Sequence, residues 1–331
     1  LVHIRFLRSP FFRVFCGFFF GKRLKQAVIF AVSAYQLSPR LSSPPLAPGV
    51  GTCYTGKNDI FRENAAMKLD FIKADPAGNT TVFVLSPVPP ALRAQVARRI
   101  MSPAGVGAEQ VGFVSEGRMD MMGGEFCGNA SLSAAAVIFS RAGLGEGLYC
   151  EELFEVSGAA EPVKISGHMV NSACFEGEVA MPLPESISEC SFLDGFEGYT
   201  FPLVRFPGIC HAIVPAGAIN PERAEAVIAS WCRQLSADAL GLMFFDRDKC
   251  TLTPLVYVAS TDTAVWEGSC ASGTAAVAAY LAELDGEYAS ARLTEPRGTV
   301  SAAATYSSSQ VRSLTMSSRA VIQGEFTALI F

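Results

Sequence analysis

Two cysteines in matching surroundings are the side chains of this sequence whose type and spacing point most directly to chemistry. Cys127 lies in the sequence GGEFCGNA at residues 123–130, and Cys270 lies in WEGSCASGT at residues 266–274. In both segments a glutamate lies two or three residues before the cysteine, small residues follow it, and an alanine-rich run of helical character comes next. The sequence therefore predicts a thiol at the start of a helix twice in one chain.

The start of a helix is a favourable place for acid–base chemistry by a thiol. Its backbone N–H groups are unpaired and carry partial positive charge, so we expect it to lower the thiol's pKa and to bind a substrate carboxylate. Two such helix ends that meet would place one sulfur on each side of the carbon next to the carboxylate. One thiolate could take the α-proton while the other thiol donates a proton to the opposite face. We therefore expect Cys127 and Cys270 to be the catalytic pair of an enzyme that inverts a stereocentre.

Small and polar residues beside the two cysteines are the expected substrate-binding groups. Gly128 and Gly273 leave the neighbouring backbone N–H groups unobstructed, and Asn129 is expected to contribute its N–H more than its side chain. The N–H groups of Ser272 and Thr274 are expected to hold a carboxylate, while their hydroxyls also suit a helix cap. Around the cysteines, the predicted binding residues are Gly128, Asn129, Glu267, Ser272, Gly273 and Thr274.

Composition limits the classes of function. Half of the 331 residues are hydrophobic and 17% are charged, which is enough for a large core in two domains or lobes. Nine of the 26 Lys and Arg lie in residues 1–66 with only two of the 31 Asp and Glu, so the rest of the chain is acidic. This argues against nucleic-acid binding. Ten scattered cysteines with no CxxC pair and no Cys/His cluster predict a reduced, cytoplasmic protein without a metal site.

Residues 1–66 are predicted to be a disordered or non-native leader. Their short apolar runs are interrupted by KRLK at residues 22–25, so neither reaches the ~18–20 residues of a membrane span. Proline and serine dominate residues 38–48. A targeting segment is the alternative, because a basic start is followed by a short apolar run, although no small-residue cleavage site follows. Met67 is the expected functional start.

From Met67 on, the pattern alternates between strands and helices. Helices are expected over residues 90–101, 130–141, 220–235 and 274–284, the third of them with Asn220 as N-cap and Pro221 in its first turn. Residues 208–211 are expected to form a turn and residues 301–317 a loose hairpin. Strands are expected over residues 68–73, 80–86, 111–115, 118–122, 163–165, 176–181, 199–206, 212–214, 242–245, 254–258, 293–299 and 318–331.

This order of elements occurs twice. Cys127 and Cys270 lie 143 residues apart, about half the length of the chain from Met67 on, as an internal duplication would give. We expect an N-terminal lobe over residues 67–184 and a C-terminal lobe over residues 185–331. Each lobe is expected to be α+β, with several strands and a central helix that begins at a cysteine.

Both cysteine segments resemble those of a known superfamily. FCGNA at residues 126–130 resembles the first cysteine motif of the diaminopimelate epimerases, and CASGT at residues 270–274 resembles the second. Within that superfamily, the chain is most similar to the histidine racemases that serve the synthesis of staphylopine-like metallophores. The shared segments are DPAGN at residues 75–79, EQVGF at residues 109–113, GEFCGNA at residues 124–130 and the Trp-Glu pair shortly before Cys270.

The resemblance implies a fold, an activity and two further site residues. The implied fold over residues 67–331 is α+β, with two pseudo-symmetric lobes, each a mostly antiparallel sheet around a central helix. The implied activity is that of an amino-acid racemase or epimerase that needs no cofactor, and the sequence shows neither a phosphate-binding glycine loop nor a lysine motif for pyridoxal phosphate. By the same resemblance, Asn79 contacts the substrate and His211 lies beside the first cysteine, Cys127.

Three departures from the epimerase pattern bear on the substrate. Ala271 follows the second cysteine where the family has glycine, and Arg297 interrupts a usual Pro-Gly-Gly turn. Glu267 is followed by Gly268 instead of the arginine that diaminopimelate epimerases place there. Without that arginine, recognition of a second carboxylate is in doubt, which favours a substrate with one carboxylate.

Other interpretations stay open. The chain could be a diaminopimelate epimerase or another isomerase of the same fold, or a catalytically silent protein that binds an amino acid. Cys127 and Cys270 could be packing residues, although their matched surroundings argue against this, and a disulfide between them would inactivate an enzyme reversibly. For Glu125 and Glu267 two interpretations are equally favoured: the carboxyl group binds the substrate's amino group, or it lies on the surface. The expected partner is a small amino-acid substrate, with neither nucleic acid nor membrane, and the sequence allows a homodimer.

Overall fold

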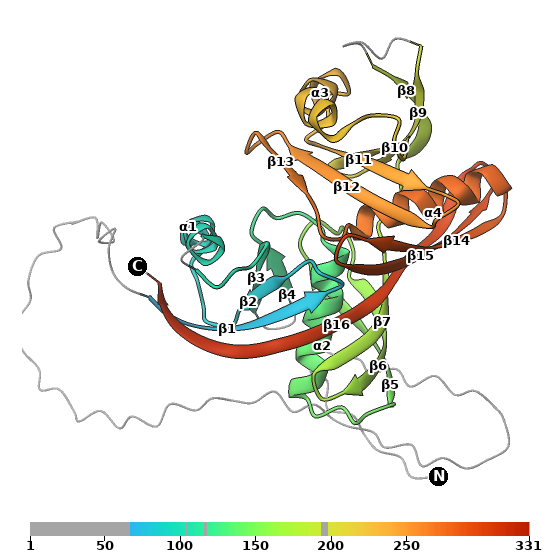
Figure 1. The fold of residues 1–331 in the computed structure, drawn as a ribbon. Helices are drawn as coiled ribbons and strands as arrows, with labels where there is room; N and C mark the ends of the chain where they lie inside the picture. Colours follow the sequence, from blue (N-terminus) through green and yellow to red (C-terminus); the bar gives the residue numbers. More distant parts are fainter. Residues whose placement is uncertain (1–66, 103–104, 116–117, 193–197, 331) are drawn as a thin grey trace, which may run out of the picture.

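The computed structural model describes residues 67–102, 105–115, 118–192 and 198–330. The predictions made for residues 1–66 lie outside this part of the chain. The described residues form a mixed fold of α-helices and a large β-sheet, with four helices (Figure 1). The helices are α1 (Pro90–Met101), α2 (Gly128–Arg141), α3 (Pro221–Gln234) and α4 (Ala271–Asp285). None of the helices in the described ranges is both long enough and apolar enough to cross a membrane.

The strands pair largely in the order of the chain. The sheet order is β1-β2-β3-β4-β5-β6-β7-β16-β15-β14-β12-β11-β10-β9-β8, with β13 paired to β12. The strands are β1 (Met67–Pro76), β2 (Thr81–Val84), β3 (Gln110–Ser115), β4 (Arg118–Met121), β5 (Tyr149–Val156), β6 (Val163–Asn171), β7 (Cys174–Ala180), β8 (Ser186–Ser191), β9 (Thr200–Phe206), β10 (Ile209–Pro215), β11 (Ala239–Asp246), β12 (Thr251–Val258), β13 (Thr263–Trp266), β14 (Tyr288–Glu295), β15 (Gly298–Ser307) and β16 (Gln310–Ile330).

The last strand, β16, ties the beginning and the end of the chain together. Its first residues pair with β15, residues 315–321 pair with β7, and residues 320–330 pair with β1. In Figure 1 it runs as one long red strand from the region of β15 to that of β1. Because β1 and β7 both pair with β16, strands β1 to β7 and β16 form a closed circuit of pairings. The contacts of β16 therefore couple the packing around α2 to that around α4.

Each helix connects two strands that lie parallel to one another. Helix α1 joins β2 to β3 and α2 joins β4 to β5, while α3 joins β10 to β11 and α4 lies between β12 and β14. All four of these strand pairs are parallel, and most of the other pairings are antiparallel. A crossover through a helix is the ordinary way to connect parallel neighbours. The order of strand, helix, strands, helix and strand therefore occurs twice along the chain, with the short strand β13 as an addition before α4 in the second half.

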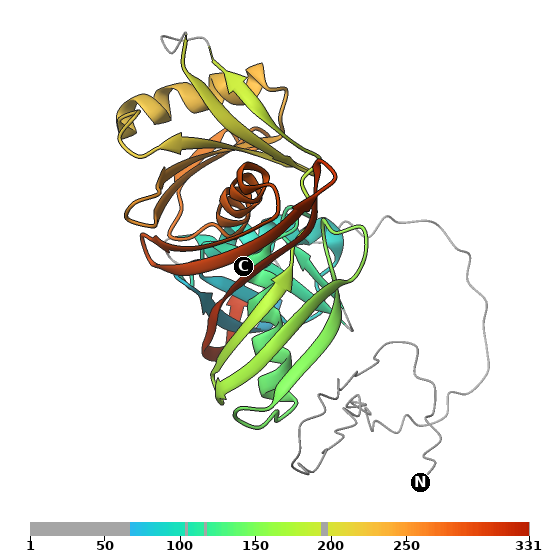
Figure 2. The ribbon, with the colours of Figure 1, turned by 90° about the vertical axis from the view of Figure 1, so that its right-hand side faces the viewer.

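Helices α2 and α4 are buried on almost every side. In α2, 11 of the 14 residues are buried, and most of them are Ala, Gly or Ser. Helix α4 likewise buries a run of small residues, Ala275–Ala279 among them. A helix surrounded by other elements is apolar around its circumference, and small side chains let strands approach it closely. Figure 2 shows α4 nearly end-on, with strands on more than one side of it. The two cysteine-headed helices thus form the centre of the largest core cluster.

Some of the boundaries expected from the sequence are wrong. Helix α2 begins at Gly128 and α4 at Ala271, two and three residues earlier than expected, so each helix starts immediately after its cysteine. The strand expected over residues 293–299 is interrupted by a turn between β14 and β15. The turn expected at residues 208–211 ends at Gly208, because β10 starts at the next residue. The hairpin over residues 301–317 is confirmed, although its pairing is regular over most of its length.

Replacing Phe175 tests the core that surrounds α2. This side chain is fully buried, and its ring centroid lies 5.4 Å from that of Phe139 on α2. We expect Phe175→Ala to lower the free energy of unfolding by about 3–5 kcal/mol, because it removes buried apolar area and leaves a cavity. Urea unfolding followed by fluorescence measures this. The matched control is Leu153→Ala on β5, whose side chain is 64% exposed and which should cost less than about 0.5 kcal/mol. Equal losses in the two variants would contradict the described packing.

Candidate active site

Cys127 and Cys270 each lie immediately before the first residue of a helix. Their backbones are nearly identical, with φ of −133° before α2 and −132° before α4. The Cys127 sulfur accepts a hydrogen bond from the Ala130 N–H at 3.4 Å, which is the bond that an N-cap side chain makes. Cys127 is partly exposed, whereas Cys270 is 6% exposed. The predicted position of a thiol at a helix start agrees with the structure at both sites.

The N-terminal ends of α2 and α4 meet. Gly128 is so close to Ala271 that a Cβ added to the glycine would lie 3.4 Å from the alanine Cβ. The Asn129 side-chain amide donates to the Ser269 hydroxyl at 3.4 Å, which joins the first turn of α2 to the segment before α4. The Asn79 amide donates to the Ser269 carbonyl oxygen at 3.1 Å. The structure therefore brings the two cysteine segments and the predicted Asn79 into one site.

Gln110 is a site residue that the sequence prediction did not include. The Cys127 thiol donates to the Gln110 side-chain oxygen at 3.4 Å, and the Gln110 amide donates to the Asn79 side-chain oxygen. Parallel pairing of β2 with β3 sets Gln110 opposite Thr81, close to the turn that contains Asn79. Gln110 belongs to the EQVGF segment that resembles the histidine racemases, and this could have marked it as a candidate. Its contact with the thiol, however, follows only from the strand register.

His211 lies on the side of the second cysteine. Its Nε2 is 3.0 Å from the Ser272 hydroxyl, which in turn is 3.5 Å from the Cys270 sulfur. No hydrogen bond joins His211 to Cys127 within the described residues, so its expected position beside Cys127 stays a prediction. Burial lowers the pKa of His211 to about 3, so the ring is neutral at ordinary pH. A neutral imidazole can orient Ser272 without bringing a charge to the site.

Glu295 is a second site residue that the sequence prediction did not include. It is the last residue of β14, 4% exposed, and its carboxyl accepts from the Cys270 backbone N–H at 2.6 Å and from the Thr274 hydroxyl at 2.6 Å. Burial raises the pKa of Glu295 to about 8. No motif in the sequence predicts this contact, because the position of β14 relative to α4 depends on the tertiary fold.

The two thiols do not have the lowered pKa that a helix start was expected to give. Burial raises the pKa of Cys127 to about 11, and the hydrogen bond from Ala130 offsets only part of that. Burial also holds the pKa of Cys270 well above its usual value, and the charge of Glu267 adds to the effect. Glu267 acts on Cys127 in the same direction, as does Glu125. Loss of hydration therefore outweighs the partial positive charge of the helix ends.

Glu267 and Arg297 bring opposite charges to the same edge of the site. Burial raises the pKa of Glu267 to about 7. The Arg297 backbone N–H donates to the Gly268 carbonyl oxygen at 2.9 Å. Its guanidinium pairs with Glu109 and reaches the Gly78 carbonyl oxygen at 3.4 Å. The arginine thus connects the turn between β14 and β15 to the turn after β1, and its charge is already engaged by a carboxylate.

The first turns of both helices offer backbone N–H groups to an anion. The N–H groups of Gly128, Ser272 and Gly273 precede the first intrahelical bonds and have no partner within the helix. The Thr274 N–H, in contrast, donates to the Cys270 carbonyl oxygen at 3.0 Å. The expectation that Thr274 holds a carboxylate through its N–H is therefore wrong. Its buried hydroxyl is engaged by Glu295, so its part in the site is structural.

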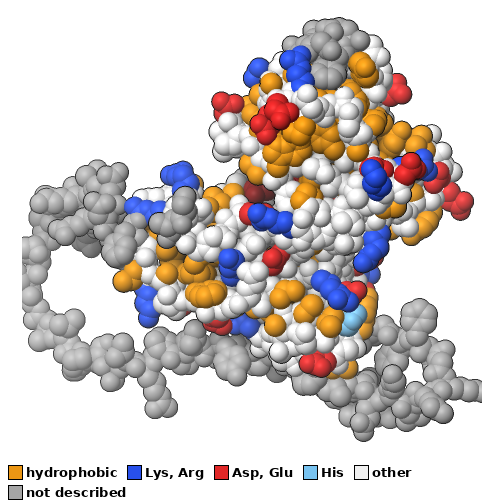
Figure 3. All heavy atoms as spheres, in the orientation of Figure 1, with side chains coloured by type: hydrophobic (Ala, Val, Ile, Leu, Met, Phe, Trp, Pro, Cys, Tyr) orange, Lys and Arg blue, Asp and Glu red, His pale blue; other side chains and the backbone are white. Residues whose placement is uncertain are grey.

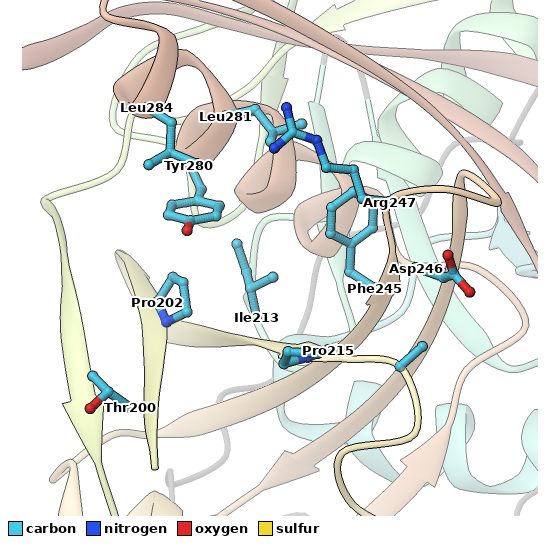
Figure 4. Close-up of a pocket in the computed structure, with 11 residues that line it drawn as sticks. Thr200, Pro202, Ile213, Pro215, Phe245, Asp246, Arg247, Tyr280, Leu281 and Leu284 are labelled. Carbon is cyan, nitrogen blue, oxygen red and sulfur yellow. The ribbon is translucent and has the colours of Figure 1, made fainter. Parts of the chain in front are cut away.

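A separate pocket lies away from the cysteines. It has a volume of about 430 Å³ and is lined by residues of β9, β10, β11 and α4 and by residues that follow β10 and β11. Figure 4 shows Tyr280, Leu281 and Leu284 of α4 on one side of it, with Pro202 and Ile213 opposite. None of its lining residues is a predicted site residue. This pocket is therefore distinct from the cysteine site, which is defined here by its hydrogen bonds and burial.

Similarity to known proteins shows the family of this chain. The family model described as the histidine racemase CntK N-terminal domain matches residues 68–328. A histidine racemase of Fusobacterium nucleatum is 34% identical over 225 residues, 64% of this chain and 81% of the relative. A histidine racemase of Staphylococcus aureus is 27% identical over 227 residues, with 64% and 79% covered. The crystal structure of a hydroxyproline epimerase from Agrobacterium vitis superposes with a TM-score of 0.58 at 12% identity, covering 80% of this chain and 93% of that one.

These findings define the class and then the family. The fold is that of racemases and epimerases, and the chain is an isomerase. It belongs to the histidine racemase family, whose model spans nearly all of the described residues.

The raised pKa of Cys127 predicts how its reactivity depends on pH. Only the thiolate reacts with iodoacetamide, so with a pKa of about 11 the rate should rise about tenfold per pH unit between about pH 7 and about pH 10. Peptide mapping by mass spectrometry, with Cys127→Ser to assign the modified peptide, measures this rate for the single residue. A rate that levels off below about pH 8 would mean that the helix start, and not burial, sets the pKa of this thiol.

Proposed function

We propose that this chain racemises histidine, with Cys127 and Cys270 as the acid–base pair. The observation that carries the proposal is the meeting of two helix N-termini, each headed by a thiol. Glu267, whose charge acts on both sulfurs, supports a common space between them. Membership of the histidine racemase family supports the choice of substrate.

The substrate carboxylate would bind between the helix ends. The unpaired N–H groups at Gly128 and Asn129 on α2, and at Ser272 and Gly273 on α4, point partial positive charge at one place. Negative charge that develops toward the carboxylate, when the α-proton leaves, would be stabilised by both helices. The α-carbon would then lie between the sulfurs, with its proton directed at one of them.

In the proposed reaction one sulfur breaks the α-carbon–hydrogen bond and forms an S–H bond. The other thiol gives its proton to the opposite face of the same carbon. The substrate's ammonium group supplies positive charge in a dry site, which favours the thiolate that the free enzyme disfavours. Glu267, held near the sulfurs and able to ionise near neutral pH, is the proposed partner of that ammonium group.

The substrate is proposed to have a single carboxylate. Arg297 lies against Gly268, where a diaminopimelate epimerase would have its own arginine, but its guanidinium pairs with Glu109. A second carboxylate would have to displace this glutamate. This arrangement favours histidine over diaminopimelate as the substrate.

We further propose that the fold consists of two pseudo-symmetric lobes, residues 67–184 and 185–331, each with α2 or α4 as its central helix. The repeated order of elements and the burial of the two helices support this division. β16 would then be shared, since it pairs with strands of both halves.

The setting of the reaction is proposed to be the cytoplasm. The eight cysteines in the described ranges are all free thiols, which suits a reducing compartment. On the face shown in Figure 3, Lys and Arg side chains are scattered among acidic and apolar ones, with no large basic area, which supports a small-molecule partner over nucleic acid. A homodimer is a proposal that analytical ultracentrifugation can test.

Proton exchange at the α-carbon tests the proposed function. In deuterated water, the protein should remove the α-proton signal of L-histidine in NMR spectra and leave that of meso-diaminopimelate. Cys127→Ser and Cys270→Ser should each slow this exchange by at least about 100-fold, since each removes one acid–base group. The matched control is Cys250→Ser, at an exposed cysteine outside the site. Full exchange in either site variant would disprove the two-thiol mechanism, and tight binding of histidine without exchange would favour a binding protein.

A further inference from the structure

A buried carboxyl group distinguishes the N-terminus of α4 from that of α2. Glu295 accepts hydrogen bonds from the Cys270 N–H and from the Thr274 hydroxyl, both at 2.6 Å. In a capping box, a glutamate on the helix itself bonds to the backbone N–H of the N-cap residue. Here the glutamate comes from the neighbouring strand β14 and makes the same bond from outside. It therefore fixes the backbone of Cys270 and the first turn of α4 together.

Among the described residues, no carboxyl group makes the corresponding bond at the N-terminus of α2. β5 follows α2 as β14 follows α4, and it ends at the buried apolar residue Val156. The residue four positions after Cys127 is Ser131, whose hydroxyl donates to the Cys127 carbonyl oxygen instead of to a carboxyl group. The Cys127 sulfur is in contact with neutral groups, the Ala130 N–H and the Gln110 side-chain amide. The charges of Glu125 and Glu267 also act on this sulfur from a distance. Within the described residues, the two thiols thus differ in the carboxyl group that is hydrogen-bonded to the backbone N–H of Cys270.

The groups that face Cys270 are mostly acidic. Glu267 precedes it on the same segment and Glu295 approaches from β14, and both have charges that act on the sulfur. From β10, His211 reaches Ser272 as a neutral ring. Glu109 acts on Glu267 but is itself paired with an arginine. Among the described residues, the side chains that act on the Cys270 sulfur are the carboxyl groups of Glu267 and Glu295 and the hydroxyl of Ser272.

We propose that Glu295 is a positioning residue that holds Cys270 at the N-terminus of α4 and disfavours its thiolate form, so that Cys127 is the thiol that gives up its proton when the substrate binds. Glu295 makes no contact with the reacting atoms and acts through the Cys270 backbone and through its charge. The inference rests on the proposed two-thiol reaction.

The proposal sets the first step of turnover. The Cys127 thiolate takes the α-proton from the face it contacts, and an S–H bond forms there. The Cys270 S–H bond breaks as its proton moves to the opposite face of the carbon. The enzyme is left with Cys127 protonated and Cys270 as a thiolate, and one proton must move from Cys127 to Cys270, through solvent, before the next cycle. The carboxyl of Glu295 would make the Cys270 thiolate short-lived and so favour this return.

The test compares Glu295→Gln with the unchanged protein. The glutamine keeps the size of the side chain and one hydrogen bond but removes the charge. We expect alkylation of Cys270 by iodoacetamide at pH 9, where Glu295 with its pKa of about 8 is mostly ionised, to become about three- to tenfold faster, since a fall of one pKa unit raises the thiolate fraction about tenfold. The rate at Cys127 should change by less than about twofold, and this thiol is the internal control. The pH at which racemisation reaches half its maximum rate should also shift.

Two further variants keep the outcome unambiguous. Glu295→Asp retains the charge but withdraws it from Cys270, so it should accelerate alkylation of Cys270 by less than Glu295→Gln does. It serves alone if the glutamine variant does not fold. Glu325→Gln, at an exposed position on β16, is the matched control and should leave both rates unchanged. Alkylation of Cys270 that stays the same or slows in a folded Glu295 variant would overturn the proposal.

Alkylation is measured without substrate, so its outcome is independent of whether the protein racemises histidine. If histidine is not racemised but Glu295→Gln still speeds the alkylation of Cys270, the proposed substrate is wrong and the proposed role of Glu295 is supported. Where racemisation is observed, kcat/KM must fall equally for both enantiomers, because these have equal free energy. A fall in kcat with little change in KM is expected for a residue that positions Cys270 and does not bind substrate.

Discussion

The meeting of two helix N-termini is the constraint on which the rest of the structure depends. Two helices that present their positive ends to one another repel unless an anion lies between them or nearby groups compensate. Here the side-chain amides of Asn79 and Asn129 bridge the gap through Ser269, and carboxyl groups lie close by. Small residues along α2 and α4 let the surrounding strands bury both helices. The fold therefore supports a site that favours a bound carboxylate.

Burial affects both the proposed reaction at this site and the protonation state of the two thiols in the free protein. The same removal of water that strengthens electrostatic interactions with a transition state raises the pKa of both thiols in the free protein. A substrate that carries its own ammonium group changes that balance when it binds. In the proposed mechanism the site would form a thiolate when an amino acid binds, and neighbouring carboxyl groups such as Glu295 would make its two thiols unequal.

Local sequence was sufficient for much of the framework. The bounds of α1 and the capping of α3 by Asn220 follow from residue type and spacing, and the structure confirms both. Small residues next to each cysteine located the helix starts within three residues. What sequence could not supply depends on tertiary contacts: Gln110 reaches the site through strand register, and Glu295 through the packing of β14 on α4. The raised pKa of Cys127 likewise depends on burial, which a motif does not encode.

The central claim is that two different thiols act on opposite faces of one carbon. The most direct measurement follows deuterium during the first few per cent of conversion of L-histidine in deuterated water. A two-thiol enzyme should give D-histidine that carries solvent deuterium, while the recovered L-histidine remains unlabelled. D-histidine that retains the original proton, or L-histidine labelled as fast as the product forms, would show that one group serves both faces and would contradict the account.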